Sequence, residues 1–187
     1  LRTPTNMFRR LKRFFSRLAK KYKPAKEKKP RLRFVLDARS RKNLEGLNKK
    51  VQPTFVELMQ IAKAMAKRYS VEIKIISGHR SYFDQAALYA KGRTKPGHIV
   101  TYAKPGYSNH NFGTAIDLGT FDKKTGAYMD ATHGALVAKI YRSIWNNAEA
   151  DGLNLEWGGN WRRFKDTPHF EYITGLTMAE MRQRNEK

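Results

Sequence analysis

Two short stretches of the sequence carry side chains that could hold a metal ion or move a proton. The first reads SNHNFGTAID and places His110 just before Gly113, with Asp117 on the segment that follows. Because side chains alternate along a strand, Asp117 would share a face with Ala115 and point away from Ile116, so its carboxylate needs a polar pocket beside an apolar core. Gly113 would let the chain bend back so that His110 approaches Asp117. An imidazole and a carboxylate are good ligands for a divalent metal, although such a pair can equally form a structural hydrogen bond.

The second stretch, DTPHF, could add a third ligand. In an unbroken strand Asp166 and His169 would face opposite ways, but Pro168 biases Thr167 toward an extended conformation. A bend at this point would turn both side chains to the same side, with His169 as a ligand and Asp166 beside it but unbound.

Three protein ligands and one water form the open coordination of a catalytic zinc ion. Zinc lowers the pKa of its bound water to about 7, and a nearby carboxylate can accept that proton and return one to a leaving amine. This is the chemistry of a metallopeptidase. The sequence contains no HExxH helix, so the site would depend on the two distant stretches meeting.

The elements that must position these residues follow from the hydrophobic pattern. It predicts helices over residues 51–69, 82–91, 134–149 and 178–185, a short helix or turn over 40–48, and strands over 71–76, 99–102, 114–118 and 169–173. Helices and short strands mix without regular βαβ alternation. The pattern therefore favours an α+β fold with a small, mainly antiparallel sheet and packed helices.

The charge of the chain divides it into two segments. The 187 residues carry a formal net charge of +22, and residues 1–33 hold 14 basic residues and one acidic residue, so this segment carries +13 of the total. Residues 7–22, MFRRLKRFFSRLAKKY, place apolar and basic side chains on opposite sides of a helix, and two prolines follow in a polar linker. We expect residues 1–33 to form a cationic amphipathic helix and linker, and residues 34–187 to form the catalytic domain.

A basic amphipathic helix with bulky aromatic residues suits an anionic membrane or lipopolysaccharide surface. A solvated basic arm, or a helix packed on the body, is the alternative. We do not expect nucleic acid as a partner, because no base-reading module accompanies the helix. The chain has no cysteine, which excludes a disulfide scaffold, a thiol nucleophile and a cysteine zinc site, and it has no apolar run near the roughly 20 residues of a membrane-spanning helix.

The residues quoted above, with the surrounding segments SGHRSYFDQAALYAKGRTKPGHIVTYAKPGYSNHNFGTAIDLG and WGGNWRRFKDTPHFEY, resemble the zinc D-Ala-D-Ala carboxypeptidase / L-alanyl-D-glutamate endopeptidase family. That family includes phage endolysins and bacterial cell-wall hydrolases. Its pattern SxHxxGxAxD followed by D/E-x-x-H is met by Ser108, His110, Gly113, Ala115, Asp117, Asp166 and His169. The resemblance covers roughly residues 34–172 and implies a small α+β domain whose antiparallel sheet lines a zinc cleft.

The resemblance also implies roles for individual residues. His110, Asp117 and His169 would bind Zn²⁺, and Asp166 would be the catalytic base. Arg80, in SGHRS, matches an arginine that family members place near the substrate. Its guanidinium suits a peptide carboxylate or the oxyanion formed on attack, and the alternative for it is a surface salt bridge.

Four further residues have two interpretations each. Ser108 could hydrogen-bond the substrate or cap the turn before His110. Gln85 is expected to anchor a helix rather than to catalyse. Trp157 and Trp161 could wall the cleft or pack in the core.

The Asp before the last histidine, with the GRTKPG and WGG segments, resembles the L-alanyl-D-glutamate endopeptidase branch of the family. This implies a zinc-dependent peptidoglycan hydrolase that cuts the stem peptide at the L-Ala–D-Glu bond with a metal-activated water, and an antimicrobial, bacteriolytic phage endolysin fits best. Such an enzyme would act on the cell wall, in the periplasm or outside the cell, after release from the host cytoplasm if it is phage-encoded. We expect a monomer whose partners are the peptidoglycan stem peptide and, through residues 7–22, the envelope surface.

Three other functions remain open from the sequence. One is a bacterial D,D- or L,D-carboxypeptidase in wall remodelling. Another is a membrane-active cationic protein whose effect comes from residues 7–22 alone. The third is a wall-binding module without activity, against which the presence of Asp166 argues.

Overall fold

The structure is a computed structural model that describes residues 35–129 and 133–185. The helix predicted over residues 7–22 and its linker lie outside the described residues. Within the described ranges there are five α-helices: α2 (Ala38–Glu45), α3 (Gln52–Tyr69), α4 (Tyr82–Ala90), α5 (Gly134–Ala150) and α6 (Met178–Asn185). Four strands accompany them: β1 (Val71–Ser77), β2 (Ala115–Asp122), β3 (Leu155–Trp157) and β4 (His169–Tyr172). The predicted α+β class is confirmed.

The four strands form one sheet in the order β1-β2-β4-β3, and all three neighbouring pairs are antiparallel. Directly paired residues of an antiparallel sheet point to the same face. The register pairs Ile73 with Thr120 and Ile75 with Leu118, and these side chains are buried on one face. The opposite face carries the pair Asp117 and His169.

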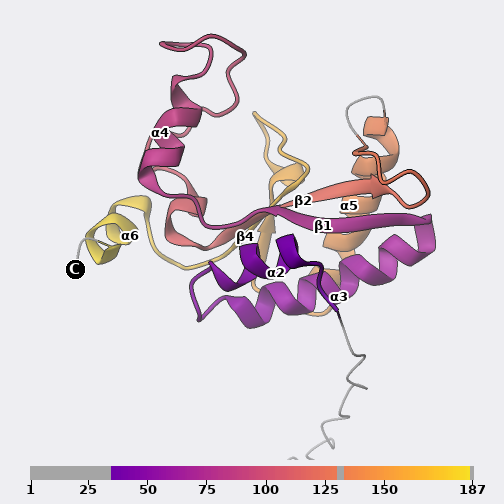
Figure 1. Cartoon of the computed structure of the whole chain (residues 1–187). Coiled ribbons are helices and arrows are strands. Elements are labelled where there is room, and N and C mark those ends of the chain that lie inside the picture. Colours follow the sequence, from indigo (N-terminus) through magenta and orange to yellow (C-terminus); the bar gives the residue numbers. More distant parts are fainter. Residues whose placement is uncertain (1–34, 130–132, 186–187) are drawn as a thin grey trace, which may run out of the picture. The chain divides into compact units, whose positions relative to one another are not determined.

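Helices α3 and α5 pack on each other, and the apolar face of the sheet packs against this pair. The buried residues of α3 recur at helical spacing, at Phe55, Leu58, Met59, Ala62 and Ala66. Tyr141 of α5 fixes the central strand, because its hydroxyl donates to the carbonyl of Leu118 at 2.8 Å and accepts from Thr120 Oγ1 at 3.0 Å. Figure 1 shows α2 and α3 running along β1. The core therefore occupies one face of the sheet and leaves the other face for a site.

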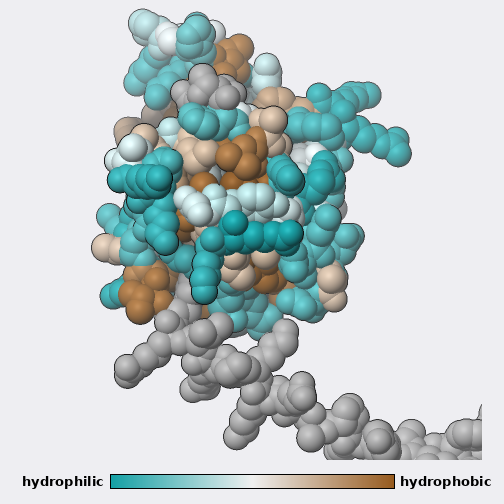
Figure 2. All heavy atoms as spheres, turned by 90° about the vertical axis from the view of Figure 1, so that its right-hand side faces the viewer, coloured by the Kyte–Doolittle hydropathy of each residue, from teal (hydrophilic) through white to brown (hydrophobic). Residues whose placement is uncertain are grey.

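The end of the domain on the right of Figure 1 has a largely hydrophilic surface, with smaller hydrophobic areas between the polar side chains (Figure 2). Among the helices of residues 35–129 and 133–185, none combines the length and the apolar character that crossing a bilayer requires.

One predicted strand is absent from the fold, and one strand of the fold was not predicted. The predicted strand over 99–102 is wrong: this segment has neither helix nor strand, and its apolar side chains Ile99, Val100 and Tyr102 are 45%, 54% and 70% exposed. They line a cavity rather than a sheet. Strand β3 was not predicted, because three residues are too few to show a periodic pattern.

Candidate metal centre

His110 lies in a short 3-10 helix, η1 (Asn109–Phe112), which ends at Gly113. Gly113 has a φ of +64°, in the left-handed region that favours glycine, and an added Cβ would lie 2.8 Å from the backbone nitrogen of Asn48. This tight turn directs the chain into β2 and places His110 beside it. The His110 side chain is buried, and its Nδ1 lies 2.7 Å from the carbonyl oxygen of Gly78. Because a carbonyl only accepts, Nδ1 carries the proton and Nε2 faces the site.

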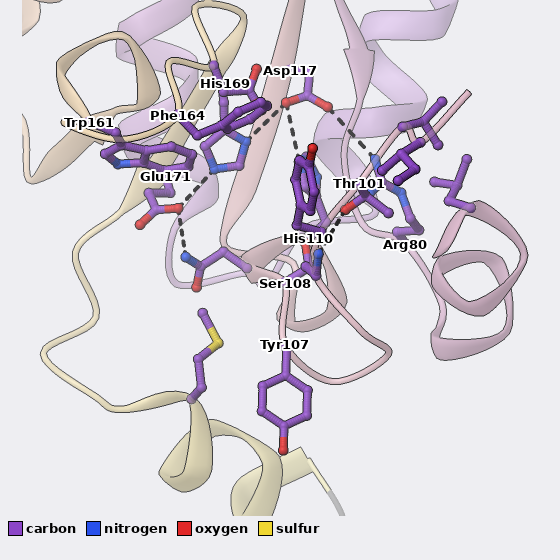
Figure 3. A pocket seen from close by; sticks show the side chains of 18 residues that line it. Arg80, Thr101, Tyr107, Ser108, His110, Asp117, Trp161, Phe164, His169 and Glu171 are labelled. Carbon is purple, nitrogen blue, oxygen red and sulfur yellow. Dashed lines mark hydrogen bonds and ion pairs between the residues drawn. The ribbon is translucent and has the colours of Figure 1, made fainter. Parts of the chain in front are cut away.

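Asp117 and His169 face each other across β2 and β4. Asp117 Oδ1 lies 3.3 Å from His110 Nε2 and 3.1 Å from His169 Nδ1. One ligand atom from each of the three residues lies within 4.8 Å of the other two. The sheet register and the η1 turn thus bring together the three side chains that the sequence singled out (Figure 3).

The charges of this group depend on one another. Burial alone would raise the pKa of Asp117, but hydrogen bonds from His110 and His169 and their positive charge hold it well below its usual range. Burial alone would lower the pKa of His169, and hydrogen bonds to Asp117 and Glu171 outweigh it and raise this pKa to about 9. The negative charge of the Asp117 carboxylate, between the two imidazoles, favours a cation at the position where the three side chains meet. Two nitrogens and one oxygen are a donor set that fits Zn²⁺.

Asp166 lies beside the three candidate ligands on the wall of the cavity. Its backbone nitrogen donates to the carbonyl of Gly158 at 3.1 Å, and its carbonyl accepts from the backbone nitrogen of His169 at 3.1 Å. A turn at Thr167–Pro168 separates Asp166 from β4, so the predicted bend is present. Burial, with the charge of Asp117 added to it, raises the pKa of the Asp166 carboxyl.

Arg80 is held in place by side chains of its own surroundings. Its Nη1 donates to Gln85 Oε1 at 3.0 Å and its Nη2 donates to Ser77 Oγ at 3.0 Å, while Nη2 lies 3.8 Å from Asp117 Oδ2. Gln85 is fully buried and also donates to the carbonyl of Ala103 at 2.8 Å. Gln85 therefore does more than anchor α4, since it fixes both the guanidinium and the loop that lines the cavity.

A cavity of about 720 Å³ opens next to these residues. Ser108 lines it, and its side chain makes no capping hydrogen bond to η1. Tyr102 and Phe164 meet edge to face across the cavity wall, with ring centroids 5.8 Å apart. The cavity thus combines polar groups at the metal centre with apolar walls.

The two tryptophans have different positions. Trp161 lines the cavity with its ring 5.2 Å from the His169 ring. Trp157 is 1% exposed and stacks on Phe170 in the core, and its Nε1 donates to the carbonyl of Thr167 at 2.7 Å. Trp157 therefore supports the Asp166 turn from behind, while Trp161 forms part of the wall.

Glu171 is a site residue that the sequence reasoning missed. Its Oε2 lies 2.9 Å from His169 Nε2 and accepts from Asn109 Nδ2 at 2.7 Å. Burial alone would raise the pKa of Glu171, but the hydrogen bond and charge of His169 lower it. The signal was present in the sequence, because residues two apart on a strand share a face.

The chain is similar to known peptidases. A family model described as D-alanyl-D-alanine carboxypeptidase matches residues 101–172. The peptidoglycan L-alanyl-D-glutamate endopeptidase CwlK of Bacillus subtilis is 42% identical over 113 residues, which are 59% of this chain and 66% of that protein. The chain is therefore similar to this family of peptidases over much of its catalytic domain. The resemblance predicted from the sequence is confirmed, and the chain spans slightly less than two thirds of the length of the Bacillus relative.

Solved structures of peptidases resemble the domain at lower similarity. The L-Ala D-Glu endopeptidase ChiX of Serratia marcescens is 28% identical, with a TM-score of 0.49 and a coverage of 73% of this chain and 87% of that one. The vancomycin-resistance D,D-pentapeptidase VanY, in a complex with Zn(II), is 16% identical, with a TM-score of 0.44 and a coverage of 72% and 83%.

Proposed function

We propose that this chain is a zinc-dependent peptidoglycan hydrolase that cuts the stem peptide between L-Ala and D-Glu. The observation that carries the proposal is the convergence of His110, Asp117 and His169 within 4.8 Å, on a cavity wall that also holds Asp166. The choice of bond is supported by the Bacillus relative, which is named for cleavage of L-alanyl-D-glutamate.

The residues of the site would divide the work of hydrolysis. His110 Nε2, an Asp117 oxygen and His169 Nδ1 would hold Zn²⁺, which when bound acidifies water and polarises a carbonyl group. The Asp166 carboxylate would accept a proton from the attacking water and deliver one to the leaving amine. The raised pKa of Asp166 suits this exchange, because it brings the carboxyl closer to the working pH.

Arg80 would bind the substrate or the negative charge that develops on the attacked carbonyl oxygen. Its two hydrogen bonds, to Gln85 and Ser77, fix the guanidinium before the substrate arrives. Ser108, which makes no capping bond in η1, would be free to hydrogen-bond the peptide.

Mapping of the cut bond tests the function. Purified sacculi are digested with the full chain, and the fragments are identified by mass spectrometry. An endopeptidase leaves glycan strands that carry only L-Ala and releases peptides that begin with D-Glu. Asp166→Asn serves as the control, because it should keep Zn²⁺ and lose on the order of 100- to 10,000-fold in turnover. Full cleavage by metal-stripped protein, with chelator present throughout, would contradict the proposal.

A D,D- or L,D-carboxypeptidase is the second candidate, and the description of the matching family model favours it. The same digest distinguishes the two functions. Release of terminal D-Ala alone, with no peptide that begins with D-Glu, would reject the endopeptidase and support the carboxypeptidase.

We further propose that residues 1–33 form a separate cationic unit that brings a monomeric, endolysin-like enzyme to the cell envelope. The +13 charge of this segment supports the proposal, since anionic lipid and lipopolysaccharide attract basic amphipathic segments. Deletion of residues 1–33 should leave hydrolysis of exposed peptidoglycan unchanged and weaken the killing of intact Gram-negative cells. Loss of hydrolysis in a truncated chain with native circular dichroism would refute the division at residue 33.

A further inference from the structure

We propose that Glu171 is a positioning residue that accepts the Nε2 proton of His169 and thereby keeps Nδ1 of this ring as the metal-binding atom. The inference rests on the metal site of the proposed function. It assigns a role to a residue that lies outside the three candidate ligands and the candidate base.

The two nitrogens of the His169 ring face different carboxylates. Nδ1 lies 3.1 Å from Asp117 Oδ1, at the proposed metal position, and Nε2 lies 2.9 Å from Glu171 Oε2. A neutral imidazole carries one proton, and the nitrogen that carries it has no lone pair for a metal. An ionised carboxylate at Nε2 can only accept, so it fixes the proton there and leaves the lone pair of Nδ1 directed at Asp117.

Glu171 is itself fixed by the fold. It follows His169 by two residues on β4, so both side chains lie on the same face of the sheet. Asn109 Nδ2 donates to the same oxygen, Oε2, at 2.7 Å. The backbone carbonyl of Asn109 accepts from Thr114 Oγ1 at 3.1 Å, and the backbone nitrogen of Tyr172 donates to the carbonyl of Thr114 at 2.8 Å. One carboxylate thus connects β4 to the η1 turn.

This connection joins the two histidines. Asn109 directly precedes His110, and Glu171 contacts the His169 ring, so a displacement of either histidine strains the same Glu171–Asn109 hydrogen bond. The acceptors behind the two rings differ in charge. His110 has the neutral carbonyl of Gly78 behind it at 2.7 Å, whereas His169 has a carboxylate. A carboxylate behind a ligating imidazole increases the basicity of the ring and orients it, and its removal typically weakens metal binding 10- to 100-fold.

The test measures Zn²⁺ affinity by competition with a chelator, using the full chain at about pH 7.5. Glu171→Ala should bind Zn²⁺ roughly 10- to 100-fold more weakly than the wild type. Glu171→Gln should lose less, about 10-fold at most, because an amide oxygen in the place of Oε2 can still accept from both Nε2 and Asn109 Nδ2. Glu72→Gln is the matched control, because Glu72 lies on β1 of the same sheet and pairs with Lys74 at the surface. Its Zn²⁺ affinity should equal that of the wild type.

Nitrogen chemical shifts of the His169 ring give a second measurement that a structural role alone would not change. In the zinc-loaded wild type the ring should show a protonated Nε2 and a metal-bound Nδ1. Glu171→Ala should show a weakened signal of the Nε2 proton through faster exchange with water.

The outcomes separate this inference from the proposed function. Unchanged Zn²⁺ affinity in Glu171→Ala would overturn the role of Glu171. If that variant does not fold without metal, the nitrogen shifts of the zinc-loaded wild type decide alone, and a metal-bound Nε2 with a protonated Nδ1 would overturn the role of Glu171. Wild-type protein that binds Zn²⁺ in this way but cuts no peptide would refute the proposed function only. Failure of the wild type to bind Zn²⁺ would refute both.

Discussion

Gly158 lies at the point where a single added methyl group would disturb two site residues at once. It begins the 3-10 helix η3 (Gly158–Asn160), directly after β3. An added Cβ would lie 2.4 Å from the carbonyl oxygen of Asp166, 3.1 Å from Asp166 Cβ and 3.2 Å from His169 Cβ. The φ angle of Gly158 is not in the left-handed region. We therefore expect Gly158→Ala to act through this steric contact and not through backbone strain.

The size of the effect follows from the shortest contact. Opening it from 2.4 Å to between 3.0 and 3.4 Å displaces the Asp166 segment by 0.6–1.0 Å. The segment cannot simply move away, because the backbone nitrogen of Asp166 donates to the Gly158 carbonyl. A displacement of about 1 Å in a catalytic group can lower turnover on the order of 100-fold. Overpacking of this kind should also lower the free energy of unfolding by about 1–3 kcal/mol.

The assay compares the rate of peptide release from sacculi, the Zn²⁺ affinity and the chemical unfolding of the variant with those of the wild type. Gly134→Ala is the matched control, because an added Cβ at this first residue of α5 meets no atom of the described residues within 4 Å. We expect the control to retain wild-type values in all three measurements. Wild-type turnover and Zn²⁺ affinity in Gly158→Ala would refute the reasoning, since the clash would then be absorbed without moving Asp166 or His169.

Three further predictions concern the supports and the charge of the site. Gln85→Ala removes the acceptor of Arg80 Nη1 and should lower kcat/KM while the Zn²⁺ affinity stays unchanged. It should also lower the free energy of unfolding by about 1–3 kcal/mol. Steady-state kinetics and urea unfolding measure the two effects, and an unchanged kcat/KM would contradict the positioning of Arg80 by Gln85. Trp157→Phe removes the hydrogen bond to the carbonyl of Thr167 and should lower the free energy of unfolding by about 1–2 kcal/mol, as measured by urea unfolding of the metal-free protein. Hydrogen bonds to two carboxylates outweigh burial and raise the pKa of His169 from 6.5 to about 9. The protonated ring therefore stabilises the metal-free protein fully below pH 6.5, and this stabilisation is lost as the pH rises through about 9. Excess Zn²⁺ should reverse that trend, because the metal binds the deprotonated ring, and unfolding at pH 6 and pH 9 with and without Zn²⁺ decides the point.

The sequence predicted the elements whose hydrophobic pattern is long. The apolar face of α3 recurs over five buried residues, and the predicted helix over 51–69 differs from it by one residue. The segment 99–102 misled the reasoning because its apolar residues resemble those of a strand, whereas they line a cavity and remain exposed. Pattern alone cannot separate these cases, since it records which residues are apolar and not whether their side chains become buried.

The site was predictable as a set of residue types and less so as a set of contacts. His110, Asp117 and His169 were identifiable because family spacing singles them out. The support of Arg80 by a fully buried Gln85 depends on the path of the loop that ends at Ala103, which no local pattern encodes. Glu171 was recognisable in principle, since strand alternation places it beside His169, but one acidic residue two positions after a histidine carries no such assignment by itself.

The pairing of Asp117 with His169 across β2 and β4 has a consequence for the maturation of the protein. A shift of this pairing by one residue would turn Ile116 toward the cavity and Asp117 into the apolar interior. Chains with the wrong register would therefore be inert rather than weakly active. Under the proposed function, the hydrogen-bonded ladder that stabilises the domain would thus restrict metal binding to correctly folded copies.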